Sequence, residues 1–153
     1  MIRKAQIQDI KPIHLLLQQY GIKGELLPRP LYNLYDHLRD FCVYEEKNKV
    51  VGCCALQFCW EDLAEIRSLA VHPDYTKKKI GTLLVENCLI EANNYNITKV
   101  FTLTYKVEFF KKFGFIQIER SKLPIKIWSD CILCIKFPDC DETAMVKEII
   151  LTT

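Results

Sequence analysis

The stretch from Glu61 to Ala92 combines the residues of this chain that are best suited to bind an anion. An apolar strand runs through a His-Pro-Asp-Tyr turn into a loop with three consecutive lysines, Lys77, Lys78 and Lys79, and then into an amphipathic helix. Backbone N–H groups at a helix N-terminus bind anions, and nearby lysines add positive charge. The pattern therefore predicts a strand-loop-helix unit that grips a phosphate.

A second group of reactive side chains lies near the end of the chain. Cys131, Cys134 and Cys140 place three thiols within ten residues, which could supply part of a tetrahedral zinc site. Asp130, Asp141 or the distant Cys59 are the candidates for a fourth ligand. The alternative is that these cysteines are buried structural thiols, because the paired Cys-x2-Cys units of strong zinc motifs are absent.

Length and composition predict one folded domain. The chain has 153 residues, of which 50% are hydrophobic and 26% charged, and its formal charge is +2. So small a charge argues against a general nucleic-acid binder. The N-terminus lacks the apolar core of a signal peptide and no apolar run is long enough to span a membrane, so a cytoplasmic protein with reduced cysteines is expected.

Hydrophobic periodicity predicts an alternation of strands and helices that would position these residues. Asp9 is the expected N-cap of the first helix, and Gly114 is expected to cap the last short helix. The strand after the central helix should lie parallel to the strand before it. The expected strands are 2–7, 41–45, 50–59, 65–71, 99–104, 115–119 and 145–151, and the expected helices are 10–20, 31–38, 78–92 and 107–113.

This order of elements resembles the GCN5-related N-acetyltransferase (GNAT) family over residues 1–120. LAVHPDY, followed by a basic loop, resembles the acetyl-CoA motif of that family, and FFKKFGF resembles its short helix ending in Gly-Phe. The resemblance implies an α/β (α+β) fold with a mixed, mostly antiparallel sheet, one splayed parallel pair and helices on both faces. It also implies a single domain over 1–153 with a cysteine-containing segment 123–153, acetyl-CoA as cosubstrate, and a homodimer as one assembly.

The segments WEDLAEIRSLAV, FTLTYKVEFFKKFGF, LPIKIWSDCILC and FPDCDETAM resemble the short, single-domain glutamate N-acetyltransferases of arginine biosynthesis. That closer resemblance implies transfer of an acetyl group from acetyl-CoA to the α-amine of L-glutamate. The alternatives are a GNAT enzyme for another small amine or a protein N-terminus, and a non-catalytic module that binds CoA without turnover.

The acetyl-CoA loop departs from the family pattern Gln/Arg-x-x-Gly-x-Gly/Ala, because only the last glycine is kept. Fewer glycines restrict how closely a backbone approaches a pyrophosphate, whereas helix-terminal amides and lysines favour it. The resemblance implies that backbone groups where the two parallel strands splay contact pantetheine and the thioester oxygen. The implied CoA-binding residues are Leu69, Ala70, Val71, Thr76, Lys77, Lys78, Lys79, Ile80, Gly81 and Thr82.

Catalytic and substrate-binding residues also follow from the resemblance. Glu65 matches the position of a general base in several family members, and its alternative is a solvated strand-edge carboxylate. Phe110 stands where many relatives have a tyrosine acid, so Tyr105, as an acid or positioning group, or a water molecule is expected to return the proton. The alternative for Tyr105 is a packed, hydrogen-bonded tyrosine without a catalytic role. Arg29 and Arg67 are expected to bind the carboxylates of a dicarboxylate substrate, since the arginine fork suits that group. The alternative is that both are surface or packing arginines. A bulge in the strand that contains Arg67 would change the face of the sheet on which its side chain lies.

Overall fold

The computed structural model describes residues 1–20, 29–122 and 142–151. Within these ranges the chain forms one sheet of seven strands in the order β1-β2-β3-β4-β5-β7-β6. The strands are β1 (Ile2–Lys4), β2 (Phe41–Glu46), β3 (Lys49–Trp60), β4 (Leu63–Val71), β5 (Lys99–Thr104), β6 (Ile116–Ile118) and β7 (Thr143–Glu148). Neighbouring strands are antiparallel except β4 and β5, which are parallel. The expected mixed sheet with one parallel pair is confirmed.

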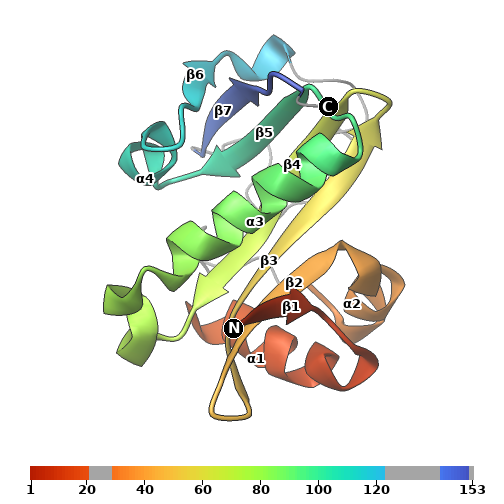
Figure 1. Cartoon of the computed structure of the whole chain (residues 1–153), viewed down its shortest axis with the longest axis vertical. Coiled ribbons are helices and arrows are strands. Elements are labelled where there is room, and N and C mark those ends of the chain that lie inside the picture. The colour runs from red at the N-terminus through yellow and green to blue at the C-terminus, as the bar shows by residue number, and fades with distance from the viewer. Residues whose placement is uncertain (21–28, 123–141, 152–153) are drawn as a thin grey trace.

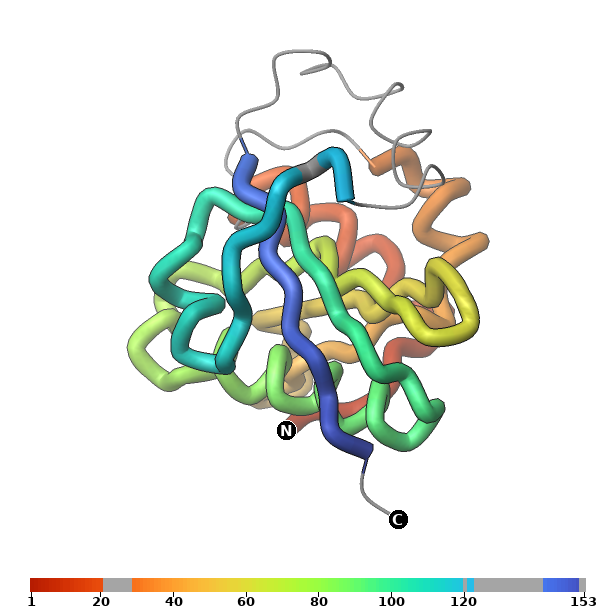
Figure 2. The backbone as a smooth tube through the Cα atoms, turned by 90° about the horizontal axis from the view of Figure 1, so that it is seen from above, coloured from red at the N-terminus to blue at the C-terminus, as the bar shows by residue number. Residues whose placement is uncertain are grey.

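Helices cover both faces of this sheet (Figure 1). One face packs against α3 (Ile80–Asn94), which crosses the sheet diagonally, and α4 (Val107–Lys111) lies at the end of β5. The other face packs against α1 (Ile10–Tyr20) and α2 (Leu31–Asp36). Seen from above, β7 runs alongside β5 (Figure 2). Short 3-10 turns are η1 (Ile7–Asp9), η2 (Leu38–Asp40), η3 (Pro73–Lys78) and η4 (Arg120–Lys122).

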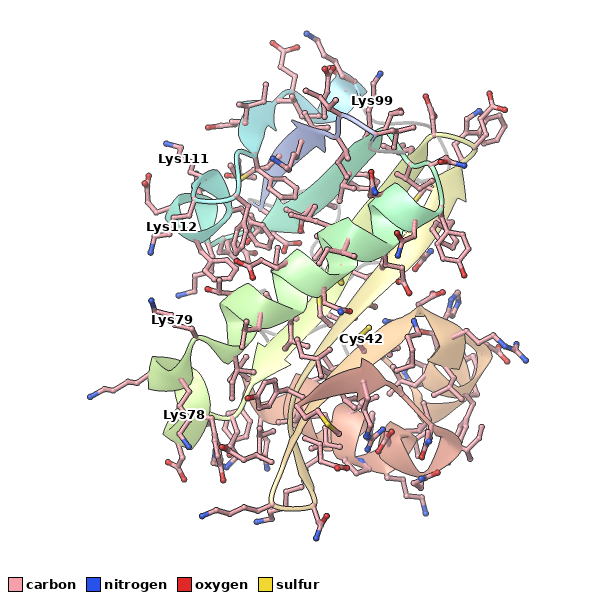
Figure 3. The ribbon with its side chains drawn as sticks, viewed as in Figure 1. Cys42, Lys78, Lys79, Lys99, Lys111 and Lys112 are labelled. Carbon is pink, nitrogen blue, oxygen red and sulfur yellow. The ribbon has the colours of Figure 1, made fainter. Side chains whose placement is uncertain are left out.

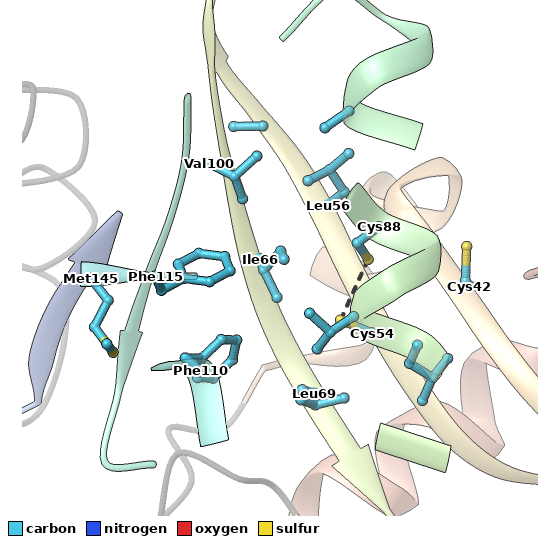
Figure 4. Close-up of a cluster of buried hydrophobic side chains, with 14 of the residues drawn as sticks. Cys42, Cys54, Leu56, Ile66, Leu69, Cys88, Val100, Phe110, Phe115 and Met145 are labelled. Atoms are coloured by element: carbon cyan, nitrogen blue, oxygen red, sulfur yellow. Dashed lines mark hydrogen bonds between the residues drawn. The ribbon is translucent and has the colours of Figure 1, made fainter. Parts of the chain in front are cut away.

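The core between α3 and the sheet contains a pair of thiols (Figure 4). Cys88 of α3 donates an S–H hydrogen bond to Cys54 of β3, with 3.6 Å between the sulfur atoms. That bond and burial raise the pKa of Cys54. All five cysteines in the described ranges are buried, so they behave as small core side chains there.

Element boundaries differ from the sequence expectation at a few points. The sequence predicts Asp9 as the N-cap of α1, and this prediction is wrong. Asp9 ends η1, where its carboxylate accepts the backbone N–H of Gln6 at 2.7 Å and binds the guanidinium of Arg3. The central helix begins at Ile80 rather than near residue 78, because η3 takes up the residues before it. The last strand starts two residues earlier than expected and ends at Glu148. Of the helices in the described ranges, none has the length and apolar character to cross a bilayer.

Gly52 allows α3 to lie close to the sheet. A Cβ at this position of β3 would lie 2.9 Å from Ile80 Cγ2 and 3.1 Å from Leu84 Cδ1, and both side chains are fully buried. We expect Gly52→Ala to destabilise the protein by about 1–3 kcal/mol through overpacking. Urea unfolding of the purified variant measures this.

Gly81→Ala is the matched control, because a Cβ at Gly81 would meet only ordinary contacts, the nearest at 3.6 Å from Phe109. Gly81 is the second residue of α3, so alanine there should be neutral or stabilising by at most about 1 kcal/mol, the gain expected in a helix interior. Equal losses of stability in the two variants would show that the close approach at Gly52 does not constrain the fold.

Candidate active site

The parallel strands β4 and β5 pair over a short distance and then separate. Their ladder joins Leu63, Ala64 and Glu65 to the first residues of β5 and goes no further. Directly beyond it, the hydroxyl of Thr102 donates to the carbonyl of Ile66 at 2.9 Å. The C-terminal half of β4 therefore keeps β3 as its ladder partner on one side only, which leaves backbone groups on the other side for a ligand.

A bulge interrupts β4 at Ser68. Ala55 of β3 faces Arg67 while Cys53 faces Ala70, so two steps along β3 correspond to three along β4. Ser68 has a φ of 58°, in the left-handed region. A bulge can turn two consecutive side chains to one face of a sheet. Here the side chains of Arg67 and Ser68 both have partners on the face covered by α1 and α2.

Glu65 and Arg67 share that face with Gln57. Glu65 is only 5% exposed although it is charged, and it lies directly across from Gln57 in the β3–β4 ladder. Arg67 Nη1 donates to Gln57 Oε1 at 3.0 Å and lies 3.9 Å from Glu65 Oε1. The Glu65 carboxylate is thus buried beside an arginine rather than solvated at the edge of a strand.

Arg29 reaches the same place from the segment just before α2. Its Nε donates to Asn33 Oδ1 and its Nη1 to Ser68 Oγ, each at 2.7 Å. The guanidinium lies over the ring of Phe41, with Cζ 5.2 Å from the ring centroid. Burial, together with the positive charge of Arg67, lowers the pKa of Arg29 to about 10. Arg29 therefore stays positively charged at neutral pH, in an environment that disfavours its charge.

The structure brings together three of the residues expected from the sequence: Glu65, Arg67 and Arg29. Counted over these three side chains, two arginines and one carboxylate give an excess of positive charge at the point where β4 and β5 separate. A protein alone gains little from crowding two cations, because their mutual repulsion opposes folding. The arrangement is suited to binding an anionic ligand next to a carboxylate that can accept a proton.

The loop between β4 and α3 offers backbone amides. The first i→i−4 backbone hydrogen bond of α3 is donated by the Leu83 N–H to the Lys79 carbonyl. The N–H groups of Ile80, Gly81 and Thr82 precede that bond and can bind an anion. The Ile80 side chain is fully buried, so this residue can contribute only its backbone.

The lysines of the loop differ in their surroundings. Lys78 is paired with Glu46 at 3.2 Å and lies over the ring of Tyr75. Lys77 and Lys79 are exposed, and in Figure 3 the side chain of Lys79 projects near the start of α3. The Thr76 hydroxyl bonds to the Pro73 carbonyl at 3.0 Å. Of the three lysines, Lys77 and Lys79 are thus the ones without such a pairing in the described part of the chain.

Lys79 has a φ of 58° and a ψ of 28°, the left-handed conformation that favours glycine. The left-handed conformation costs a residue other than glycine about 1–2 kcal/mol. Glycine avoids this cost, but it also raises the conformational entropy of the unfolded chain, which cancels part of the gain in stability. We expect Lys79→Gly to stabilise the protein by about 0.5–1 kcal/mol, measured by urea unfolding. Lys79→Ala is the control, since it removes the charge and keeps the strained conformation. A similar gain in both variants would mean that charge repulsion, not backbone strain, is relieved.

The remaining expected residues lie elsewhere or outside the described ranges. Tyr105 is half-buried and directly follows β5, where that strand has left β4. Phe110 is buried among Phe109, Phe113 and Phe115. No group of three or more His, Cys, Asp or Glu side chains is arranged to hold a metal ion in the ranges that the structure describes. The three cysteines expected as zinc ligands, Cys131, Cys134 and Cys140, lie outside those ranges.

Sequence reasoning missed three residues that contact the expected ones: Ser68, Asn33 and Gln57. Asn33 lies four residues after Arg29 at a helix start, a spacing that brings side chains together. Gln57 follows from extending the β3–β4 hairpin register outward from its turn. No signal in the sequence marks Ser68, because a left-handed serine inside an apolar strand has no characteristic pattern.

Two parallel strands that separate beside the N-terminus of a long helix, as β4 and β5 do before α3, are the arrangement expected of an enzyme that transfers an acetyl group from CoA to an amine. The chain belongs to the GNAT acetyltransferase family, since the sequence profile of the acetyltransferase (GNAT) domain matches residues 37–117. It is an N-acetyltransferase that uses acetyl-CoA.

Similar proteins agree with this family. An uncharacterized N-acetyltransferase of Chlorobaculum tepidum is 42% identical over 97% of this chain and 96% of its own length. An amino-acid acetyltransferase of Mycobacterium tuberculosis is 36% identical over 85% of this chain and 76% of its own. The structure of N-acetylglutamate synthase from Neisseria gonorrhoeae, complexed with coenzyme A and N-acetyl-glutamate, superposes with a TM-score of 0.87 at 27% identity. That match covers 98% of this chain but 35% of the longer synthase.

Proposed function

We propose that this enzyme acetylates the α-amine of L-glutamate and so forms N-acetylglutamate, as in arginine biosynthesis. The observation that carries the proposal is the convergence of Arg29 and Arg67 on the buried Glu65. Glutamate at neutral pH has two carboxylates and one ammonium group, with a net charge of −1. Two arginines and one carboxylate offer the complementary charges, so the occupied site would be electrically balanced.

In the proposed reaction, Glu65 accepts a proton from the substrate ammonium, directly or through water, and frees the amine to attack the thioester. Backbone N–H groups of β4 in the segment Leu69, Ala70 and Val71, beyond the last β4–β5 pair, stabilise the negative charge that develops on the thioester oxygen. The CoA thiolate leaves and is protonated by Tyr105 or by water. The amine nitrogen bonds to the thioester carbon and the carbon–sulfur bond then breaks. The nitrogen gives up its second proton in this step, which balances the proton taken up by the CoA thiolate, while the first proton stays on Glu65 until it is released to solvent.

The amides of Ile80, Gly81 and Thr82 are the proposed pyrophosphate site, with Lys77 and Lys79 as the accompanying cations. Lys78 contributes less in this proposal, because its ammonium is already paired with Glu46. The left-handed Lys79 supports the assignment, since it sets the direction in which α3 begins. A lysine can adopt the conformation for which other family members use glycine, at a cost in stability.

Release of free CoA thiol from acetyl-CoA tests the proposal directly. The panel consists of glutamate, glutamine, aspartate and an amine without a carboxylate, such as tyramine. Glutamate should give the highest kcat/KM, by at least about tenfold over glutamine, because glutamine lacks the second carboxylate. A preference for tyramine would contradict the carboxylate site.

A non-catalytic CoA-binding module is the second candidate, and Phe110 in the position of the usual tyrosine favours it. Phe110 cannot donate a proton and is buried in an aromatic cluster. Acetyl-CoA binding, measured by calorimetry, without thiol release for any amine in the panel would support that candidate over the enzyme.

A further inference from the structure

Arg29 is held in place by neutral groups alone, within the ranges that the structure describes. The acceptor for its Nε is the amide oxygen of Asn33, and the acceptor for its Nη1 is the hydroxyl of Ser68, both at 2.7 Å. The third contact is the ring of Phe41. No carboxylate of the described residues lies within ion-pair distance of Arg29. A guanidinium this buried is usually paired with a carboxylate.

The neutral partners have an electrostatic consequence. A carboxylate in place of the Asn33 amide would form a charge-assisted bond with Arg29 and neutralise much of its field. An amide or hydroxyl oxygen fixes the direction of the guanidinium without forming an ion pair, so the charge of Arg29 is offset at longer range by Asp40 and Glu65. Arg29 Nη2 has no partner among the described residues, so the outer end of the fork remains for another acceptor.

Ser68 adds a donor beside that fork. Its Oγ already accepts a hydrogen bond from Arg29 Nη1, so the hydroxyl proton must point to a different acceptor. Ser68 occupies the bulge with a φ of 58°, and this turns its side chain toward Arg29 rather than along the regular alternation of the strand. The hydroxyl and the guanidinium can therefore donate to the same anion.

We infer that Asn33 and Ser68 form a neutral clamp on Arg29, in which Asn33 is a positioning residue and Ser68 donates its hydroxyl proton to a substrate carboxylate. This inference rests on the proposed function and assigns substrate specificity to uncharged side chains. Because the Asn33 amide is neutral, it orients Arg29 without forming an ion pair, so the guanidinium can form one with the substrate carboxylate. The ligand class is an amino acid whose carboxylate accepts from Arg29 and Ser68 together.

Asn33→Asp separates this role from a structural one, because the new carboxylate can still accept the Arg29 Nε bond. We expect thermal stability to be unchanged or higher and the KM for glutamate to rise by at least about tenfold. The KM for acetyl-CoA should stay within about twofold. Asn48→Asp is the matched control, since Asn48 is exposed in the β2–β3 turn and gains the same charge far from Arg29.

Ser68→Gly is the second variant, because glycine relieves the left-handed backbone and removes the CH2OH side chain that carries the hydroxyl. Its stability should not fall, whereas the KM for glutamate should rise by about threefold to tenfold. If wild type acetylates glutamate while both variants keep the wild-type glutamate KM, the clamp is wrong and the proposed function stands. If wild type acetylates no carboxylate-bearing amine, the proposed function fails first.

Discussion

Glu65→Gln should lower kcat for glutamate acetylation by about 10²–10⁴-fold while the protein stays folded. Glutamine has nearly the same shape as glutamate, so it fits the buried position across from Gln57, but it cannot accept the proton of the substrate ammonium. The KM for acetyl-CoA should change little, since Glu65 lies before the separation of β4 and β5 and not in the phosphate loop. Steady-state kinetics with the thiol assay measure both quantities.

Glu61→Gln controls for the loss of one negative charge. Glu61 is exposed in the turn between β3 and β4, four residues before Glu65, and this variant should keep the wild-type rate. Circular dichroism and thermal unfolding would show that both variants are folded. A Glu65→Gln enzyme with more than about one-tenth of the wild-type kcat would rule out Glu65 as the principal base.

Arg29→Ala should raise the KM for glutamate by about 30-fold to 150-fold, because a charge-assisted hydrogen bond to a carboxylate contributes about 2–3 kcal/mol. The acetyl-CoA KM should remain within about twofold. Arg29→Lys keeps a positive charge but loses the planar fork, so its effect should lie between those of alanine and wild type. Initial rates with glutamate and acetyl-CoA varied in turn provide these constants.

Arg39→Ala is the matched control for Arg29→Ala, because Arg39 is exposed in η2 and has no place in the proposed site. Unfolding curves are needed beside the kinetics, since Arg29 also contacts Asn33, Ser68 and Phe41. Equal rises in the two KM values after Arg29→Ala would point to a general distortion and against a carboxylate site.

Local pattern was enough to predict much of the sheet and the central unit. The apolar strand before the loop and the four-residue spacing of Ile80, Leu84 and Cys88 predicted β4 and α3, because both periods are set by backbone geometry. The same alternation predicts that Glu65 and Arg67, two residues apart in one strand, share a face. Their burial against Gln57 also needs the register of β3 and β4.

Long-range packing could not be predicted in the same way. Arg29 meets Ser68 across 39 residues of sequence, and no local rule states which loop covers which end of a sheet. The bulge at Ser68 depends on a left-handed serine, whose cost is met only by surrounding structure. Asp9 was expected to cap a helix because of its type, but its partners are Arg3 and Gln6, and Arg3 lies in β1.

The bulge in β4 also determines which changes in chain length this strand can accept. Ser68 is the extra residue of the bulge. Ile66, Leu69 and Val71 all pack on the α3 face, which is the alternation that a regular strand without Ser68 would show. Deletion of Ser68 would therefore leave the core-facing phase intact while removing a site-facing hydroxyl, whereas a single deletion in a strand without a bulge shifts the phase of every residue beyond it. An insertion of this kind is a route by which a lineage can add a polar group to a ligand site without redesigning the core beneath it.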